Sequence, residues 1–148
     1  MILKIAVLSG DGIGPEVTEQ SIKVLKSLGK KFNHKIELES GLVGAVAIDK
    51  YNDPYPDETH QVCLNSDAIL FGAIGDPKYD NDPKAKVRPE QGLLKMRKKL
   101  GLYANLRPTK VFESLLEMSP IKEERISGTD ILFVRELTGG IYFGERGR

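Results

Sequence analysis

The chain has 148 residues, of which 40% are hydrophobic and 29% charged, a composition typical of a globular domain with a hydrophobic core. Its 22 Lys and Arg residues are balanced by 21 Asp and Glu residues, so no net charge favours nucleic acid or an anionic membrane surface as a partner. The apolar run at 2–8 is too short to span a bilayer. The single cysteine, Cys63, excludes an internal disulfide, and we expect a cytoplasmic protein.

The N-terminal part of the chain has the pattern of a strand followed by a helix. Residues 2–8 predict a buried strand, and the glycines of SGDGIGPE (9–16) predict a turn. Pro15 marks the start of a helix and Gly29 is a plausible C-terminal cap. Residues 34–40 then alternate as the next strand.

The rest of the chain continues this alternation and then becomes mostly strand. The pattern predicts an α/β fold, with a parallel or mixed sheet flanked by helices, which divides near residue 100 into a first domain (1–100) and the start of a second (101–148). The expected elements are a helix at 57–66, a buried strand at 67–75, an exposed polar loop at 75–89, a helix at 90–101, and strands at 103–111, 130–137 and 139–145, the last two joined as a hairpin.

The glycine-rich loop at 9–16 permits three interpretations. A dinucleotide fingerprint requires G-x-G-x-x-G, whereas Gly10, Gly12 and Gly14 are spaced G-x-G-x-G. Asp11 and Glu16 would repel a pyrophosphate at the positive end of the following helix. A strand-to-helix turn that needs glycine torsions explains the stretch equally well. In the third interpretation, the loop touches a ligand without binding its phosphates.

The helix expected at 90–101 carries an unusual combination of side chains on one face. Glu90, Leu93, Leu94 and Arg97 occupy positions 0, +3, +4 and +7, so they share that face, while the apolar stripe beside it, with Leu93, Met96 and Leu100, suits a core. An acid, an apolar pair and a guanidinium in this order suit a ligand with a branched alkyl group and a carboxylate. The alternative is an amphipathic helix whose charged residues lie in water.

Two further arginines and one tyrosine are candidates for binding or chemistry. Arg107 precedes Pro108, and Arg135 follows an apolar run, where a guanidinium needs a partner. That partner is either an acid such as Glu136 or a dicarboxylate ligand held through two hydrogen bonds. Tyr142, between glycines on an expected strand, is either a packing residue or a proton donor.

Five stretches are distinctive when taken together: GDGIGPEV (10–17), DAILFGAIG (67–75), RPEQGLLKMRK (88–98), YANLRP (103–108) and VRELTGGIYFGE (134–145). In this order and spacing they resemble the 3-isopropylmalate dehydrogenases of the isocitrate/isopropylmalate dehydrogenase family. The resemblance covers essentially the whole chain. It implies an enzyme that oxidises (2R,3S)-3-isopropylmalate with NAD and Mg²⁺ or Mn²⁺ and decarboxylates the product to 2-oxoisocaproate, in leucine biosynthesis.

The resemblance also implies roles for individual residues. The full enzyme is expected to be a homodimer whose metal ligands lie outside this chain. Leu93 and Leu94 separate this chain from isocitrate dehydrogenases, which the resemblance implies have small polar residues at these positions to receive a third carboxylate. By residue match, Arg97, Arg107 and Arg135 hold the malate carboxylates, Leu93 and Leu94 line the isopropyl pocket, Tyr142 assists proton transfer, and Ile13, Asp76, Pro77, Lys78 and Glu90 lie along NAD.

The chain departs from the family in details and in length. Asp76 stands where a second glycine is usual, Tyr79 where tryptophan is common, and Gln91 where arginine or threonine is frequent. Family members are roughly twice as long or more, so we expect an N-terminal portion that is inactive alone. A related decarboxylating dehydrogenase acting on isocitrate, homoisocitrate or tartrate is one alternative. A non-catalytic module for dicarboxylate binding or oligomerisation is another.

Overall fold

A computed structural model describes residues 1–80, 86–137, 139 and 147 of the chain. These residues form two compact units, Met1–Leu100 and Gly101–Arg148. None of the helices among the described residues is long and apolar enough to cross a membrane.

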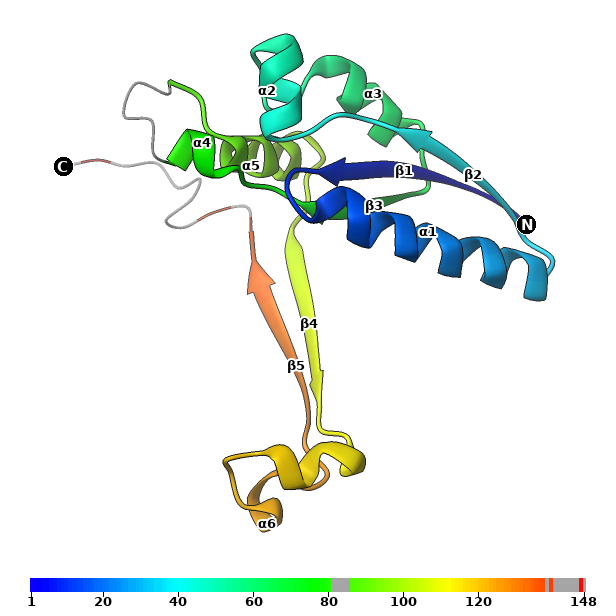
Figure 1. Ribbon diagram of the computed structural model, residues 1–148, viewed down its shortest axis with the longest axis vertical. Helices are drawn as coiled ribbons and strands as arrows, with labels where there is room; N and C mark the ends of the chain where they lie inside the picture. Colours follow the sequence, from blue (N-terminus) through cyan, green and yellow to red (C-terminus); the bar gives the residue numbers. More distant parts are fainter. Residues whose placement is uncertain (81–85, 138, 140–146, 148) are drawn as a thin grey trace. The chain divides into compact units, whose positions relative to one another are not determined.

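The first unit is built on a parallel sheet of three strands. The strands β1 (Ile2–Gly10), β2 (Lys35–Ser40) and β3 (Ala68–Ala73) lie in the order β2-β1-β3 (Figure 1). All three were expected from sequence, and the parallel α/β arrangement is confirmed. Because the strands are parallel, their carboxyl ends meet at one edge of the sheet.

Helices connect and cover the strands. Helix α1 (Gly14–Lys31) packs against all three strands, and α3 (Asp57–Leu64) packs against β1 and β2 (Figure 1). Helix α5 (Pro89–Lys99) confirms the helix expected at 90–101. Two short helices of this unit were not expected from sequence: α2 (Ala45–Tyr51), and α4 (Pro77–Asp80) within the predicted polar loop.

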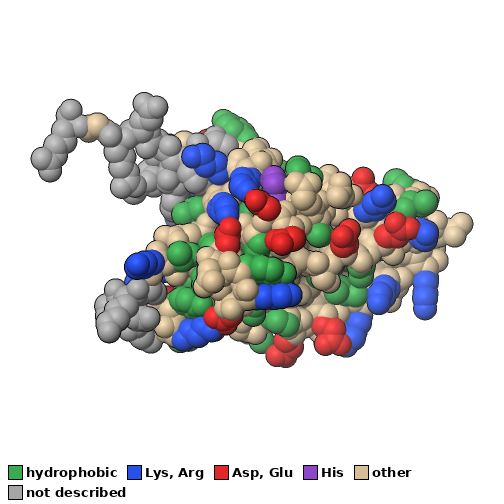
Figure 2. All heavy atoms as spheres, turned by 90° about the horizontal axis from the view of Figure 1, so that it is seen from above, with side chains coloured by type: hydrophobic (Ala, Val, Ile, Leu, Met, Phe, Trp, Pro, Cys, Tyr) green, Lys and Arg blue, Asp and Glu red, His purple; other side chains and the backbone are tan. Residues whose placement is uncertain are grey.

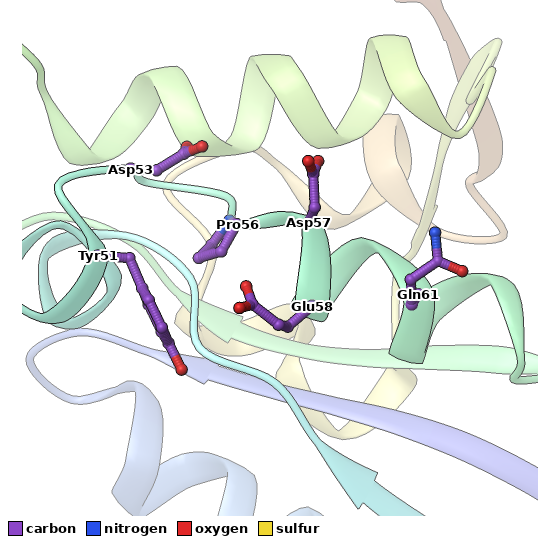
Figure 3. A pocket seen from close by; sticks show the side chains of 6 residues that line it. All are labelled: Tyr51, Asp53, Pro56, Asp57, Glu58 and Gln61. Atoms are coloured by element: carbon purple, nitrogen blue, oxygen red, sulfur yellow. The ribbon is translucent and has the colours of Figure 1, made fainter.

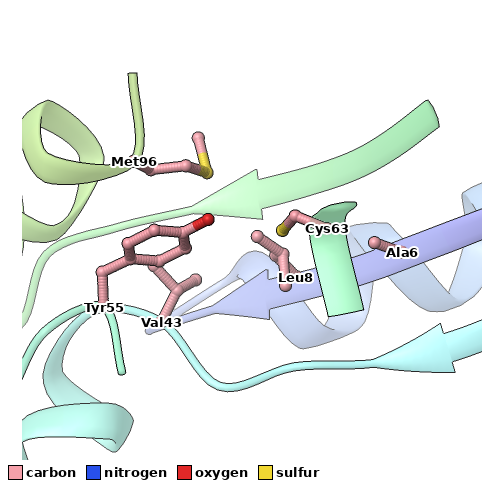
Figure 4. Close-up of a cluster of buried hydrophobic side chains, with 6 residues drawn as sticks. All are labelled: Ala6, Leu8, Val43, Tyr55, Cys63 and Met96. Carbon is pink, nitrogen blue, oxygen red and sulfur yellow. The ribbon is translucent and has the colours of Figure 1, made fainter. Parts of the chain in front are cut away.

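The core of the first unit surrounds β1, because β1 is the middle strand and both of its faces are covered. Ile5–Leu8 are all buried, as expected of a strand between two layers of helices. On one face, Ala6 and Leu8 join a cluster that also contains residues of α3, α5 and the loops after β2 (Figure 4). The other members of this cluster are Val43, Tyr55, Cys63 and Met96, and Leu93 and Leu100 pack against it.

Two details differ from the sequence predictions. The strand at 67–75 was expected to be buried, yet β3 is only half-buried, because it pairs with β1 alone among the described strands. Gly29 was expected to cap α1, but the helix continues to Lys31. Gly29 instead lets α1 approach β2: a Cβ there would lie 3.0 Å from the His34 carbonyl oxygen and 3.2 Å from the Ile36 Cδ1 atom.

The second unit contains an antiparallel pair, β4 (Ala104–Lys110) and β5 (Asp130–Glu136). The connection between them contains a 3₁₀ helix, η1 (Glu113–Met118), and a short helix, α6 (Glu123–Ile126). The strand expected at 139–145 and its hairpin with 130–137 lie almost entirely outside the described residues. This unit exposes many large apolar side chains: Leu106, Phe112, Leu115, Met118, Ile121, Ile131, Leu132, Phe133 and Val134.

Candidate functional site

The candidate site of the first unit lies at the carboxyl edge of its parallel sheet. Ligands of open α/β sheets bind in crevices beyond the carboxyl ends of the strands. The segments that leave β1, β2 and β3 at this edge are 11–13, 41–44 and 74–80. The first and last of these contain four of the residues expected to lie along the cofactor: Ile13, Asp76, Pro77 and Lys78.

Asp11 fastens these segments together. Its side chain is buried, with 3% exposed, and its Oδ2 accepts hydrogen bonds from the backbone N–H of Ala45 at 2.7 Å and of Gly75 at 3.1 Å. Its Oδ1 accepts a third from Val46 N–H at 3.0 Å. Sequence reasoning treated Asp11 only as a charge that repels pyrophosphate. In the structure it satisfies the free N–H groups at the start of α2 and holds the end of β3.

Two glycines, Gly44 and Gly75, let the backbone approach the Asp11 carboxylate closely. Gly44 has a φ of +84°, and a Cβ there would lie 2.2 Å from the Asp11 Oδ2 atom. Gly75 has a φ of +136°, a conformation that side-chain-bearing residues rarely adopt. The turn interpretation of the glycine loop therefore describes its geometry, and Ile13 remains 57% exposed at its tip.

A second set of contacts, from α4 to Asp49 of α2, holds the segment that follows Gly75. The Nζ of Lys78 lies 2.5 Å from the Asp49 Oδ2 atom, and the Tyr79 hydroxyl donates to Asp49 Oδ1 at 2.8 Å. These hydrogen bonds, first that from Lys78 and then that from Tyr79, hold the pKa of Asp49 below its ordinary value. The backbone N–H of Lys78 donates to the Asp76 Oδ1 atom at 3.0 Å. The ammonium of Lys78 thus binds α2, while its backbone N–H binds Asp76.

Helix α5 brings Glu90 to the same edge. An ideal Cβ on Gly75 would lie 3.5 Å from the Glu90 Oε1 atom, so this exposed carboxylate adjoins the end of β3. Gln91, which departs from the family pattern, has a structural role at the start of α5. Its Oε1 accepts a hydrogen bond from Arg88 N–H at 3.2 Å, and its backbone N–H donates to the Arg88 carbonyl oxygen at 3.1 Å. These reciprocal bonds fix the first turn of α5.

Three of the four residues predicted to share a binding face of α5 are partly shielded from solvent. Leu93, Leu94 and Arg97 are all half-buried, and Leu93 also packs against the core cluster. In the part of the chain that the structure describes, the Arg97 guanidinium has no hydrogen-bond or ion-pair partner. A half-buried cation beside an apolar pair is suited to an anionic ligand with an alkyl group.

Two ion pairs fix α5 against the start of α3 and the turn that precedes it. Lys95 Nζ lies 2.5 Å from the Asp53 Oδ2 atom, and Lys99 Nζ lies 2.6 Å from Asp57 Oδ1. Figure 3 shows Asp53 and Asp57 pointing toward α5 at the rim of a surface hollow. These acids are thus occupied in packing one element on another. The hollow, which Tyr51, Asp53, Pro56, Asp57, Glu58 and Gln61 line, contains none of the expected site residues.

The second unit brings Arg107 and Arg135 together. In the antiparallel register Asn105 lies opposite Arg135, and Arg107 follows two positions along β4, so all three side chains share one face. The Arg107 Nε–H donates to the Asn105 Oδ1 atom at 2.8 Å. Asn105 was not singled out by sequence reasoning, because its place beside both arginines depends on strand pairing. Tyr142 lies outside the described residues.

The distribution of charged and metal-ligating side chains indicates no further site among the described residues. Figure 2 shows Lys and Arg side chains interspersed with Asp and Glu over the face in view, with apolar side chains between them. Within residues 1–80, 86–137, 139 and 147, no group of three or more His, Cys, Asp or Glu side chains is placed to hold a metal ion.

Comparison with known proteins identifies the family. The family model of isocitrate/isopropylmalate dehydrogenase matches residues 4–148. The chain belongs to this family. This confirms the isocitrate/isopropylmalate dehydrogenase fold that the sequence motifs predicted. It also confirms that the family is one of oxidoreductases.

Curated relatives within the isocitrate/isopropylmalate dehydrogenase family are similar over nearly all of this chain. Proteins named 3-isopropylmalate dehydrogenase from Bacteroides fragilis (strain YCH46) and Bacillus subtilis (strain 168) are 59% and 57% identical to it, over 99% and 96% of the chain. The chain spans about two fifths of their length, 41% and 39% respectively.

Solved structures of similar proteins align with most of this chain. A beta-decarboxylating dehydrogenase from Thermococcus kodakarensis in its apo form aligns with a TM-score of 0.64 and 32% identity, over 90% of this chain and 33% of that one. An isocitrate dehydrogenase from Methylococcus capsulatus aligns with a TM-score of 0.71 and 26% identity, over 97% and 37%.

Proposed function

We propose that the chain supplies the N-terminal portion of an NAD-dependent 3-isopropylmalate dehydrogenase of leucine biosynthesis. The reaction is oxidation and decarboxylation of (2R,3S)-3-isopropylmalate to 2-oxoisocaproate. The observation that carries this proposal is the 59% identity to a protein of that name over 99% of the chain. The half-buried face of α5 with Leu93, Leu94 and Arg97 supports it, because an apolar pair next to a guanidinium with no partner among the described residues matches an isopropyl group next to a carboxylate.

The choice of isopropylmalate over isocitrate rests on Leu93 and Leu94. Isocitrate carries a third carboxylate in place of the isopropyl group. Half-buried leucine side chains offer that carboxylate no hydrogen-bond donor, and an unpaired buried charge is costly. The isopropyl group, in contrast, gains stability by leaving water.

The arginines bind the substrate in this proposal. Arg107 and Arg135 lie on one face of the β4–β5 pair, and together they present two guanidinium groups to a dicarboxylate. Asn105 orients Arg107 through the 2.8 Å hydrogen bond, so it is a positioning residue. Arg97 takes part from α5, and Tyr142 moves a proton at the carbon that loses carbon dioxide.

The residues at the carboxyl edge of the sheet fit a dinucleotide. Exposed Ile13 offers an apolar surface, and Glu90 places a carboxylate beside the backbone of Gly75, where it would stabilise a cationic nicotinamide ring. NAD, when bound, accepts the hydride from the substrate alcohol. A divalent metal, Mg²⁺ or Mn²⁺, belongs to the proposal for the whole enzyme, and no residue of this chain is assigned to it.

The exposed apolar side chains of the second unit support a dimer of the complete enzyme. Leu132 and Val134 share one face of β5 and are 56% and 64% exposed, and Leu106, opposite Val134 on β4, is 60% exposed on the same face. A contiguous exposed apolar patch of this kind marks an interaction surface. The dimer is expected in the cytoplasm, where Cys63 remains a thiol.

A fusion protein tests the proposed function. Residues 1–148 replace the matching 41% of the Bacteroides fragilis relative, and the purified fusion is assayed for NADH formation with isopropylmalate, isocitrate and tartrate. We expect turnover with isopropylmalate and at least about a hundredfold preference over isocitrate, as an unpaired buried charge costs several kcal/mol. Equal or faster turnover of isocitrate or tartrate would refute the proposal in favour of the related dehydrogenases.

The pocket assignment is tested in the same fusion. Leu94→Ser should raise KM for isopropylmalate about tenfold, since it removes roughly 1 to 2 kcal/mol of apolar contact. Leu64→Ser is the matched control, because Leu64 is exposed at the end of α3. An unchanged KM in the Leu94 variant would show that this residue does not line the pocket. The 148-residue chain assayed alone should show no turnover, and measurable turnover would contradict that expectation.

A further inference from the structure

The segment Gly75–Asp80, which contains Asp76, Pro77 and Lys78, is fastened at both ends to a single short helix. At its start, Asp11 binds the N–H of Gly75 and also the N–H groups of Ala45 and Val46, the first residues of α2. At its other end, Lys78 and Tyr79 bind Asp49, which lies one turn further along the same helix. Both carboxylates therefore connect this segment to α2.

From this arrangement we propose that α2 is the platform that positions Gly75–Asp80 for the dinucleotide, and that Asp11 and Asp49 are its positioning residues. The inference rests on the proposed function only in naming the dinucleotide. Neither aspartate is assigned to the ligand itself. Asp11 is buried behind the loop, and both oxygens of Asp49 are already occupied by α4.

The contacts around Asp11 are of a kind that fixes geometry. A charged carboxylate that accepts three backbone N–H bonds in a buried place forms stronger bonds than neutral acceptors do. No side chain can replace hydrogen at Gly44 without meeting Asp11 Oδ2, and a Cβ at Gly12 would lie 3.8 Å from the Gly75 carbonyl oxygen. The glycine loop after β1, the start of α2 and the end of β3 are thereby packed as one body.

The contacts at Asp49 are weaker and exposed. Asp49 and Lys78 side chains are 50% and 49% exposed, and such pairs contribute little to global stability. Their effect is local, because α4 is only four residues long and cannot hold its own conformation. The Asp76 side chain adds to this order, since its Oδ1 accepts the N–H of Lys78.

Local order is tested by amide hydrogen exchange in the 148-residue chain and in the fusion protein. In the wild type, the N–H groups of Ala45, Val46 and Gly75 should be protected. Asp11→Asn should accelerate their exchange by at least about tenfold, because a bond to a charged acceptor is lost. Asp67→Asn is the matched control, since Asp67 accepts Lys4 N–H at 2.8 Å from the opposite end of β3. Equal rates at Gly75 in wild type and Asp11→Asn would overturn the proposal.

Asp49→Ala provides a second test that does not risk the fold, because the position is exposed and alanine favours a helix. It should accelerate exchange at Lys78 and Tyr79 about tenfold and leave Gly75 protected. Unchanged exchange at both amides would refute the role of Asp49.

Kinetics of the fusion protein separate positioning from a merely structural role. Both variants should raise KM for NAD by about tenfold while kcat and KM for isopropylmalate change by less than about twofold. Equal losses in every parameter would assign Asp11 and Asp49 to general stability and overturn the proposal. If the wild-type fusion turns over no isopropylmalate, the proposed function fails, while the exchange rates still decide whether α2 holds the segment.

Discussion

Replacing Gly92 by alanine sets two physical effects against each other. Gly92 lies within α5 (Pro89–Lys99) and is buried. Helix propensity alone predicts that alanine stabilises this position by about 1 kcal/mol, because glycine loses more backbone entropy on folding. The structure predicts the opposite sign, because α5 passes very close to Pro54.

The steric cost follows from the position of the added atom. An ideal Cβ on Gly92 would lie 2.5 Å from the Pro54 carbonyl oxygen and 3.0 Å from its carbonyl carbon. Overpacking costs about 1 to 3 kcal/mol. The obstacle here is backbone, and Pro54 O also accepts the Gly44 N–H at 2.8 Å, so it cannot move without breaking that bond. The upper end of the range applies, and the net loss in free energy of unfolding is about 2 kcal/mol.

Urea unfolding of the 148-residue chain, followed by far-ultraviolet circular dichroism, measures this loss. With a slope of roughly 1.5 kcal/mol per molar, the midpoint should fall by about 1.3 M. Lys98→Ala, at an exposed position of the same helix, is the control and should change stability by less than about 0.5 kcal/mol. A midpoint in Gly92→Ala equal to or above that of the wild type, with an unchanged slope, would refute the packing of α5 on Pro54.

Three further predictions concern titratable side chains. Cys63 should resist thiol reagents in the folded chain and react fully in urea, because burial raises the pKa of its thiol; rapid labelling without denaturant would contradict this. The pKa of Asp49 is lowered in the folded chain, so its contact with Lys78 stabilises α4 at pH values above the ordinary pKa of an aspartate, about 4. This stabilisation is lost as the pH falls below that value and through the pKa of Asp49 in the folded chain. Carbon-detected NMR of the Asp49 carboxyl measures this, and titration at or above the ordinary value would disprove it. Lys95→Met should lower the free energy of unfolding by less than about 1 kcal/mol, because its pair with Asp53 is one-third exposed; a larger loss would mean that the pair is effectively buried.

Much of the fold could be predicted from the sequence because the signals are local. The strands β1, β2 and β3 and the helices α1, α3 and α5 each follow from a periodicity of apolar residues and from turn residues at their ends. The shared face of Glu90, Leu93, Leu94 and Arg97 follows from helical geometry alone. The family, likewise, follows from five short motifs in a fixed order.

Other features could not be read from the sequence because they depend on residues far apart in the chain. Asp11 reaches N–H groups 34, 35 and 64 residues away, and nothing in SGDGIGPE indicates that its carboxylate turns inward. Helix α2 was missed because it is only seven residues long, and the four apolar residues that begin it, Ala45–Ile48, carry no distinctive period.

What the sequence determined by itself is the kind of protein and the surface chemistry of α5, since both depend only on residue order and local geometry. The tertiary structure alone decided what surrounds those residues. It left β3 half-buried with one partner among the described strands, set Arg107 and Arg135 beside Asn105 through the pairing of β4 with β5, and connected Gly75–Asp80 to α2 by hydrogen bonds. Each of these depends on hydrogen bonds between distant backbone segments, and only the completed topology brings such segments together.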